Sequence, residues 1–242
     1  MNRAFSNIKL FALIFGALIL FSCGPTRFVE PLNPGKKAIT ASLGGPLINV
    51  PGIGTIPIPF TSIGFGYGVN ANTTVHGAIF PTAAIFGTYQ FEMGLTRRLW
   101  QSNSNHMGVT IIPGFNFATD RFEWNSKLWP QLDINYYWKY KYNRQIQDDL
   151  LTNSNKIGAM MYCGMGSWYE LASRKVHNVV QSPRVVPIIQ IGNDLNWRKW
   201  ILRTEFKIMA PFSNNKDIVV DYKSLTGDNG AVGLYLGVIK RF

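Results

Sequence analysis

The sequence predicts an all-β fold, a closed antiparallel transmembrane barrel of about ten strands, within a range of roughly eight to twelve. Two observations lead to this prediction. Apolar and polar residues alternate along most of the chain, which is the period of a strand and not of a helix. In addition, 46% of the residues are hydrophobic and only 15% are charged, whereas about 25% are charged in ordinary soluble domains. The chain therefore has too few charges for a normal water-facing surface.

Residues 1–22 precede the predicted barrel and have the features of a signal peptide. A basic start is followed by the apolar run LFALIFGALILF and then by Ser22 and Cys23. The end of this segment, from Leu20 to Cys23, resembles the lipobox of bacterial lipoproteins. That resemblance implies cleavage before Cys23, followed by acylation of its thiol and of the new amino group. The alternative is an ordinary signal peptide with an incidental cysteine.

Residues 23–36 contain the sequence GPTRFVEPLNPG, which is rich in proline and glycine and predicts an extended tether. With more than one acyl chain on Cys23, this tether would be held stably in a membrane. The chain is thus predicted to consist of a signal peptide (1–22), an acylated N-terminal tether (23–36) and the barrel (37–242).

Strands are predicted wherever the period of two is sustained. In residues 200–210, Leu202 and Phe206 fall on one face, and Arg203 and Glu205 fall on the other. Several such runs reach the roughly 9–11 residues that a tilted strand needs to cross a membrane. The predicted strands are about 37–46, 60–70, 73–81, 86–99, 106–118, 129–142, 156–168, 185–196, 199–210 and 231–242.

This pattern has a soluble alternative, a β-sandwich with one solvated face. Against it, Trp and Tyr residues occur near strand ends on the apolar face, as in the aromatic girdles of membrane barrels. The chain resembles the small outer-membrane β-barrel proteins of Gram-negative bacteria, and the resemblance covers residues 37–242. Its most specific part is the terminal strand, in which apolar residues alternate up to an aromatic end: Val232, Leu234, Leu236, Val238 and Phe242.

The resemblance implies an outer-membrane location and contact with outer-membrane lipids and lipopolysaccharide. It also implies that the barrel-assembly machinery recognises Phe242 as an assembly signal. An even number of strands would leave both chain ends on the periplasmic side, with the longer loops facing outward. A lipid on Cys23 is then expected in the inner leaflet of the outer membrane.

The inward face of the predicted barrel carries charges of both signs. A barrel of about ten strands encloses little more than its own side chains, and unpaired charges in such an interior would be costly. The charges are therefore expected to pair with one another across the lumen, and a surplus of cations would favour anions if the barrel conducts. The predicted network consists of Glu92, Arg98, Asp133, Lys139, Asp194, Arg203, Glu205 and Lys207.

Other kinds of site are weakly supported. The net charge of +11 comes from scattered basic residues, so the electrostatic footprint of a nucleic-acid-binding protein is absent. No cofactor motif is recognisable, and the histidines show no metal-binding spacing. No catalytic residue is predicted, and the single weak candidate is His177, in a loop that also contains Glu170. Cys163 lies in the apolar stretch MMYCGM and is not expected to be reactive.

The expected function is a structural or accessory role in the cell envelope, without enzymatic activity, alone or within a larger envelope complex. One alternative is a narrow pore for small solutes, with a preference for anions. The other is an enzyme at the extracellular rim that modifies lipid A or the cell surface.

Overall fold

The structure is a computed structural model that describes residues 24–50, 54–122, 124–141, 157–171, 184–214 and 228–242. The predicted signal peptide, Cys23 and His177 lie outside the described residues.

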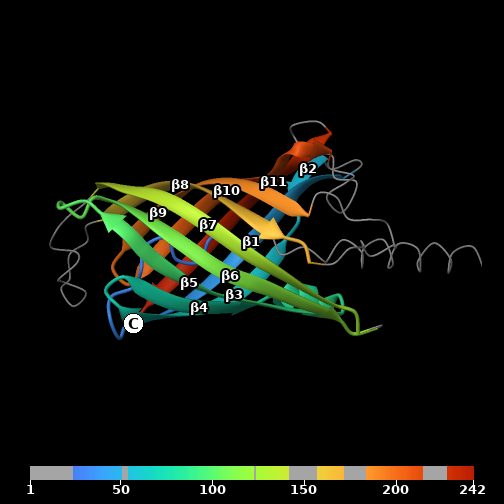
Figure 1. The fold of residues 1–242 in the computed structure, drawn as a ribbon, viewed down its shortest axis with the longest axis horizontal. Coiled ribbons are helices and arrows are strands. Elements are labelled where there is room, and N and C mark those ends of the chain that lie inside the picture. The colour runs from blue at the N-terminus through green and yellow to red at the C-terminus, as the bar shows by residue number, and fades with distance from the viewer. Residues whose placement is uncertain (1–23, 51–53, 123, 142–156, 172–183, 215–227) are drawn as a thin grey trace, which may run out of the picture.

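Ten antiparallel strands form a closed barrel within the described part of the chain, as the sequence predicts. Successive strands are neighbours in the wall, and β11 closes the barrel by pairing with β1 (Figure 1). Each predicted strand is present, with its ends shifted by a few residues, so the predicted fold class is confirmed. The barrel strands are β1 (Lys37–Val50), β3 (Phe60–Asn70), β4 (Thr73–Ile79), β5 (Thr88–Gln101), β6 (Met107–Asp120), β7 (Ser126–Lys141), β8 (Ile157–Tyr169), β9 (Val185–Trp197), β10 (Trp200–Asn214) and β11 (Asn229–Arg241).

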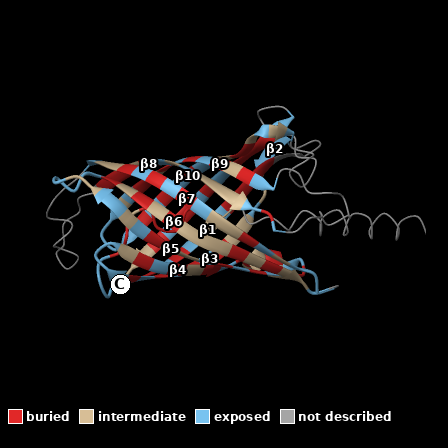
Figure 2. Cartoon of the chain, in the orientation of Figure 1, coloured by how far each residue is buried: buried red, intermediate tan, exposed pale blue. Residues whose placement is uncertain are grey.

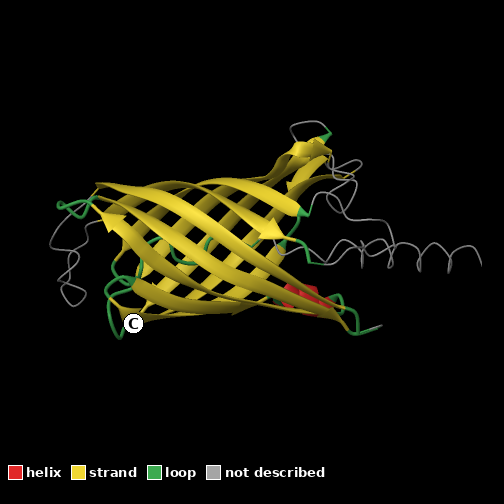
Figure 3. Ribbon diagram, viewed as in Figure 1, coloured by secondary structure: helices red, strands yellow, loops and turns green. Residues whose placement is uncertain are grey.

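Two short elements were not expected from the sequence. Strand β2 (Gly54–Pro57) folds back on the end of β1 and pairs with it from Leu47 to Val50. Helix α2 (Pro81–Ile85) connects β4 to β5, where only a short link was predicted (Figure 3). Pro81 opens this helix, at a position where its missing N–H costs no hydrogen bond. Among the described residues no helix has the length and apolar character needed to span a membrane.

Strands β1 and β11 form the seam that closes the barrel. Ile39 is opposite Lys240 and Leu43 is opposite Leu236 in antiparallel register. At the last residue, the backbone N–H of Phe242 donates a hydrogen bond to the carbonyl of Lys37 over 2.8 Å. The first and last barrel strands thus leave no open edge along the paired stretch.

The two ends of the barrel differ. The "termini end" contains the start of β1, the end of β11 and the tight links 71–72 and 198–199. The "loop end" contains α2 and the link 121–125. Because every neighbouring pair of strands is antiparallel, the connections alternate between these two ends.

Inward and outward faces alternate along each strand, as Figure 2 shows. On β10, Leu202 is 48% exposed, whereas Arg203 is 3% and Glu205 is 1% exposed. The outward residues of the other strands are also mostly large and apolar, and Cys163 is among the exposed outward residues. An apolar exterior around a polar interior is the arrangement of a membrane barrel, and it excludes the soluble β-sandwich.

The residues that precede β1 lie inside the barrel. Residues 24–32, here called the luminal segment, run between its walls without regular secondary structure (Figure 3). Phe28 and Val29 are 3% and 0% exposed and contact inward side chains of the wall. The segment is extended, as expected of the predicted tether. It differs from that prediction in filling the lumen, because its polar groups find their partners there.

Candidate functional site: the luminal segment and the charges around it

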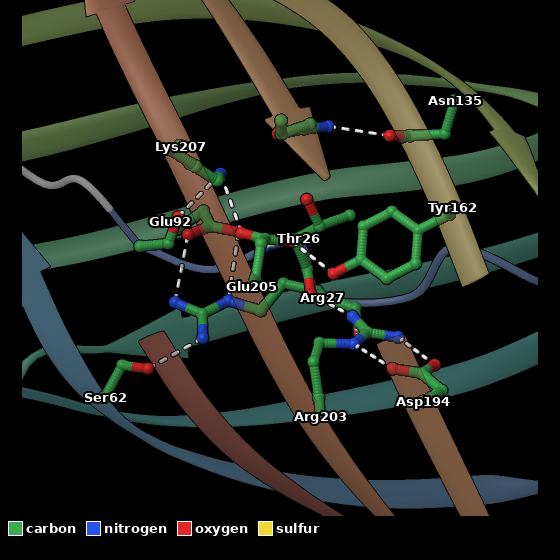
Figure 4. A network of polar contacts seen from close by, with 12 residues as sticks. Thr26, Arg27, Ser62, Glu92, Asn135, Tyr162, Asp194, Arg203, Glu205 and Lys207 are labelled. Atoms are coloured by element: carbon green, nitrogen blue, oxygen red, sulfur yellow. Dashed lines mark hydrogen bonds and ion pairs between the residues drawn. The ribbon is translucent and has the colours of Figure 1, made fainter. Parts of the chain in front are cut away.

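Arg27 is the main side-chain contact between the luminal segment and the wall. Its Nε and Nη2 atoms donate to the two carboxylate oxygens of Glu92 over 3.2 and 3.0 Å, and Nη1 donates to Ser62 Oγ over 2.7 Å (Figure 4). The guanidinium also lies 5.5 Å from the centre of the Phe80 ring. Arg27 is 3% exposed and Glu92 is 5% exposed, so this is a buried, two-pronged ion pair.

Strand β10 holds the backbone of the same segment. Both guanidinium edges of Arg203 are in use: Nε and Nη2 donate to Asp194 over 2.6 Å, and Nη1 donates to the carbonyls of Thr26 and Arg27. The carboxylate of Glu205 accepts the backbone N–H of Thr26, at 3.0 and 3.2 Å from its two oxygens. Side chains of the wall therefore bind the N–H of Thr26 and the carbonyls of Thr26 and Arg27 (Figure 4).

Two further side chains complete the cluster around Glu205. Lys207 Nζ lies 3.3 Å from a Glu205 oxygen and donates to the carbonyl of Gly24 over 2.9 Å. The hydroxyl of Tyr162 donates to the other Glu205 oxygen. A carboxylate that is 1% exposed would be costly without such partners. The carboxylate of Glu205 thus contacts Lys207 and Tyr162 of the wall and the backbone N–H of Thr26 in the segment.

Threonine side chains bind three further backbone groups of the segment. Thr96 donates to the carbonyl of Phe28 over 2.6 Å, and Thr110 donates to the carbonyl of Val29 over 2.9 Å. Thr74 Oγ1 accepts the N–H of Leu32 over 2.7 Å. All three threonines are 4% exposed or less. The segment therefore takes the place that water would otherwise take in the lumen.

At the termini end, Glu30 of the segment neutralises basic residues of the wall. Its Oε1 atom accepts a hydrogen bond from Lys139 Nζ over 2.6 Å and lies 3.6 Å from Arg98 Nη2. The segment thus contributes one cation, Arg27, near the middle of the lumen and one anion, Glu30, near its termini end.

Interior glycines make room for the segment. A Cβ atom on Gly66 would lie 2.4 Å from the ring of Phe28, and one on Gly68 would lie 2.2 Å from the carbonyl oxygen of Asn33. Both distances are far below van der Waals contact. At Gly66 and Gly68 the neighbour is therefore the chain that precedes β1.

The predicted interior network is only partly formed as expected. Arg203 pairs with Asp194, and Lys207 pairs with Glu205, both within the wall. Glu92, Arg98 and Lys139 instead pair with Arg27 and Glu30 of the luminal segment. Asp133 is buried, and its Oδ1 atom has no hydrogen-bond partner in the described part of the chain.

Arg27, Glu30 and the backbone of Thr26 are parts of the site that were not predicted from the sequence. A weak signal was present, because a segment predicted as a solvated tether contains an apolar pair, Phe28 and Val29, between two opposite charges. The inward glycines at 66 and 68 were a second signal, because a strand residue without a side chain often marks a close approach of another part of the chain.

The remaining predicted sites have simple placements. His177 and Cys23 lie outside the described residues, and the nearby Glu170 is buried and accepts a hydrogen bond from Trp129 Nε1 over 2.6 Å. Phe242 is half-exposed at the termini end, with Lys240 Nζ 5.2 Å from its ring centre. Across the described residues, no group of three or more His, Cys, Asp or Glu side chains could hold a metal ion.

Comparison with known proteins gives a likeness of fold only. No family model matches the chain, and no curated protein matches it. Similar solved structures include an outer membrane channel from Pseudomonas putida F1, at 9% identity and a TM-score of 0.47, over 90% of this chain and 100% of that one. LpxR from Salmonella typhimurium is similar at 8% identity and a TM-score of 0.41, over 85% and 99% of the two chains. The N-terminal β-barrel domain of Pseudomonas aeruginosa OprF is similar at 8% identity and a TM-score of 0.33, over 87% and 100%. At 8–9% identity, these likenesses assign no function to this chain.

Proposed function

We propose that the chain is an outer-membrane barrel kept closed by its own luminal segment, and that it serves as a non-enzymatic structural or accessory component of the cell envelope. One observation carries this proposal: Arg27 of the luminal segment forms a buried ion pair with Glu92, and the backbone of the segment is bonded to the buried side chains of Arg203 and Glu205. Arg27, Glu92, Arg203 and Glu205 are all 5% exposed or less.

The energetic argument is that opening the lumen is costly. Withdrawing the segment would remove Arg27 from Glu92 and leave Arg203 without two of its acceptors. Removal of one partner from a buried ion pair typically costs about 3–5 kcal/mol. Water that entered the lumen would recover part of that cost, but the apolar contacts of Phe28 and Val29 would also be lost. The segment is therefore expected to stay seated in the resting barrel.

Planar bilayer recording tests whether the barrel is closed. The full chain is expected to give no conductance steps, whereas a chain with residues 25–32 replaced by a Gly-Ser sequence of equal length is expected to give discrete steps. A matched control replaces the exposed link 102–105 in the same way and is expected to stay silent. Discrete steps from the correctly folded full chain would contradict the proposal and favour the narrow-pore alternative.

The position of Gly24 bears on the proposed lipid anchor. Gly24 lies inside the barrel, where its carbonyl accepts a hydrogen bond from Lys207 and a Cβ atom would lie 3.4 Å from the Phe80 ring, just before α2 at the loop end. Cys23 directly precedes Gly24 in the sequence. A lipid on Cys23 could reach the leaflet at the termini end only if the segment left the lumen. We therefore propose that an acylated Cys23 would emerge at the loop end.

Mass spectrometry of the purified protein tests the acylation itself, with Cys23→Ser as the control that cannot carry a thioether. Hydrogen exchange of residues 25–32 in the same preparation then separates the two positions of the anchor. An acylated protein with a protected segment supports exit at the loop end. An acylated protein with a freely exchanging segment would contradict it and support an anchor at the termini end.

An accessory role predicts that the barrel co-purifies with a larger envelope assembly after extraction in mild detergent. Recovery of the tagged barrel without any other protein would contradict the accessory role and favour a purely structural one. The rim-enzyme alternative receives no support from the described residues; it predicts that His177→Ala abolishes a change in lipid A acylation, which can be measured by mass spectrometry of lipid A.

A further inference from the structure

A cavity of about 150 Å³ lies at the termini end, between the last residues of the luminal segment and the wall. Its lining combines apolar groups, including Phe28, Leu32 and Ile239, with the basic residues Lys36, Lys139, Lys141 and Arg241. The cavity is separate from the Glu92 and Glu205 contacts that hold the segment.

The carboxylates in this lining are already neutralised. Asp194 receives two hydrogen bonds of 2.6 Å from Arg203. Glu30 pairs with Lys139 at 2.6 Å and with Arg98 at 3.6 Å. In the described part of the chain, Lys36, Lys141 and Arg241 have no carboxylate oxygen within the 4.0 Å of a salt bridge. The cavity therefore has a surplus of positive charge.

Arg241 supplies a second, independent observation. Its Nη2 atom donates to the carbonyl of Arg198 over 2.9 Å. Its Nε atom is buried and has no acceptor among the described residues. Buried N–H groups without an acceptor are rare in proteins because they forfeit the hydrogen bond they had in water. An anionic oxygen in the cavity would provide that acceptor, and guanidinium groups suit carboxylate and phosphate oxygens especially well.

We propose that this cavity binds a small organic oxyanion, whose carboxylate or phosphate group contacts Arg241, Lys36 and Lys141 and whose short apolar part contacts Phe28, Leu32 and Ile239. This binding site goes beyond the closed lumen and the envelope role proposed above. The cavity needs the seated luminal segment, because that segment forms one of its sides.

Isothermal titration calorimetry tests the site on the full chain, folded in zwitterionic detergent at low ionic strength. Butyrate and inorganic phosphate are the two probes. Saturable binding of butyrate, tighter than that of phosphate, is expected because phosphate cannot use the apolar lining. Tighter binding of phosphate would retain the anion site but overturn its organic ligand class.

The variants Arg241→Gln and Lys141→Gln are each expected to weaken butyrate binding about tenfold, the effect of losing one charge-assisted contact. Arg97→Gln is the matched control, since Arg97 is an exposed cation near the same end of the barrel, outside the cavity. Lys141 is also exposed, so Lys141→Gln keeps the test valid if Arg241→Gln fails to fold.

Two results would overturn the proposal: no saturable heat with either probe, or an equal loss of affinity in Arg97→Gln, which would indicate general attraction to a basic protein. The anion site rests on the closed lumen. A silent bilayer with no saturable heat would overturn the anion site alone, whereas conductance of the full chain would contradict the closed lumen, so failure of the two proposals can be distinguished.

Discussion

The substitution Arg27→Met tests how strongly the luminal segment is held. It keeps much of the volume of the side chain but removes two hydrogen bonds to Glu92, at 3.0 and 3.2 Å, and one to Ser62, at 2.7 Å. Because Glu92 is 5% exposed, its carboxylate would stay buried with no cation beside it. The expected loss in the free energy of unfolding is about 3–5 kcal/mol, the range for breaking a buried ion pair from one side.

The measurement is equilibrium unfolding by guanidinium chloride in detergent or lipid, followed by tryptophan fluorescence. Glu92→Gln and the double variant complete a mutant cycle, in which the two single losses should exceed the loss in the double variant by at least about 2 kcal/mol. Arg97→Met, at an exposed position, is expected to change the free energy by no more than about 0.5 kcal/mol. A loss below about 1 kcal/mol for Arg27→Met, or strict additivity in the cycle, would refute the reasoning.

Three further outcomes are expected. Gly66→Ala places a Cβ atom 2.4 Å from the Phe28 ring and should raise the hydrogen-exchange rate of the luminal segment about tenfold. The control Gly237→Ala, whose Cβ atom would have its nearest neighbour at 3.5 Å, should leave that rate unchanged. Leu234→Arg puts a charge on the outward face near the middle of β11 and should cost about 2–4 kcal/mol when the barrel is folded in lipid vesicles; an unchanged stability would argue against a lipid-facing exterior. In a Cys23→Ser chain folded in lipid vesicles, the outward thiol of Cys163 should react with a water-soluble maleimide only after unfolding, and rapid labelling of the folded protein would contradict its position.

The wall of the barrel could be predicted because its pattern is local. In residues 202–207 every second side chain is charged, and backbone geometry alone sends alternate residues to opposite faces. The apolar face must then point outward to lipid, and the polar face must point into the narrow interior. The seam was also predictable, because β1 and β11 are the remaining edges once all the other strands have paired with their neighbours in sequence.

The luminal segment could not be predicted in this way. Residues 24–32 have no period, and Pro25 and Pro31 indicate only an extended chain. Its position depends on contacts distant in sequence, such as that between the N–H of Thr26 and Glu205. The requirement that buried charges be paired did predict a network, but many pairings of the inward charges satisfy it. The partner of Glu92 is Arg27, which lies before the first strand and not on an inward strand face.

Hydrogen exchange of the luminal segment tests the central claim most directly. The N–H groups of Thr26 and Leu32 donate to Glu205 and Thr74 inside the barrel. In the folded, detergent-solubilised protein, residues 25–32 are therefore expected to exchange as slowly as the strands that surround them. Exchange of these residues at the rate of an unstructured peptide, while the strands remain protected, would contradict a barrel that is closed by its own chain.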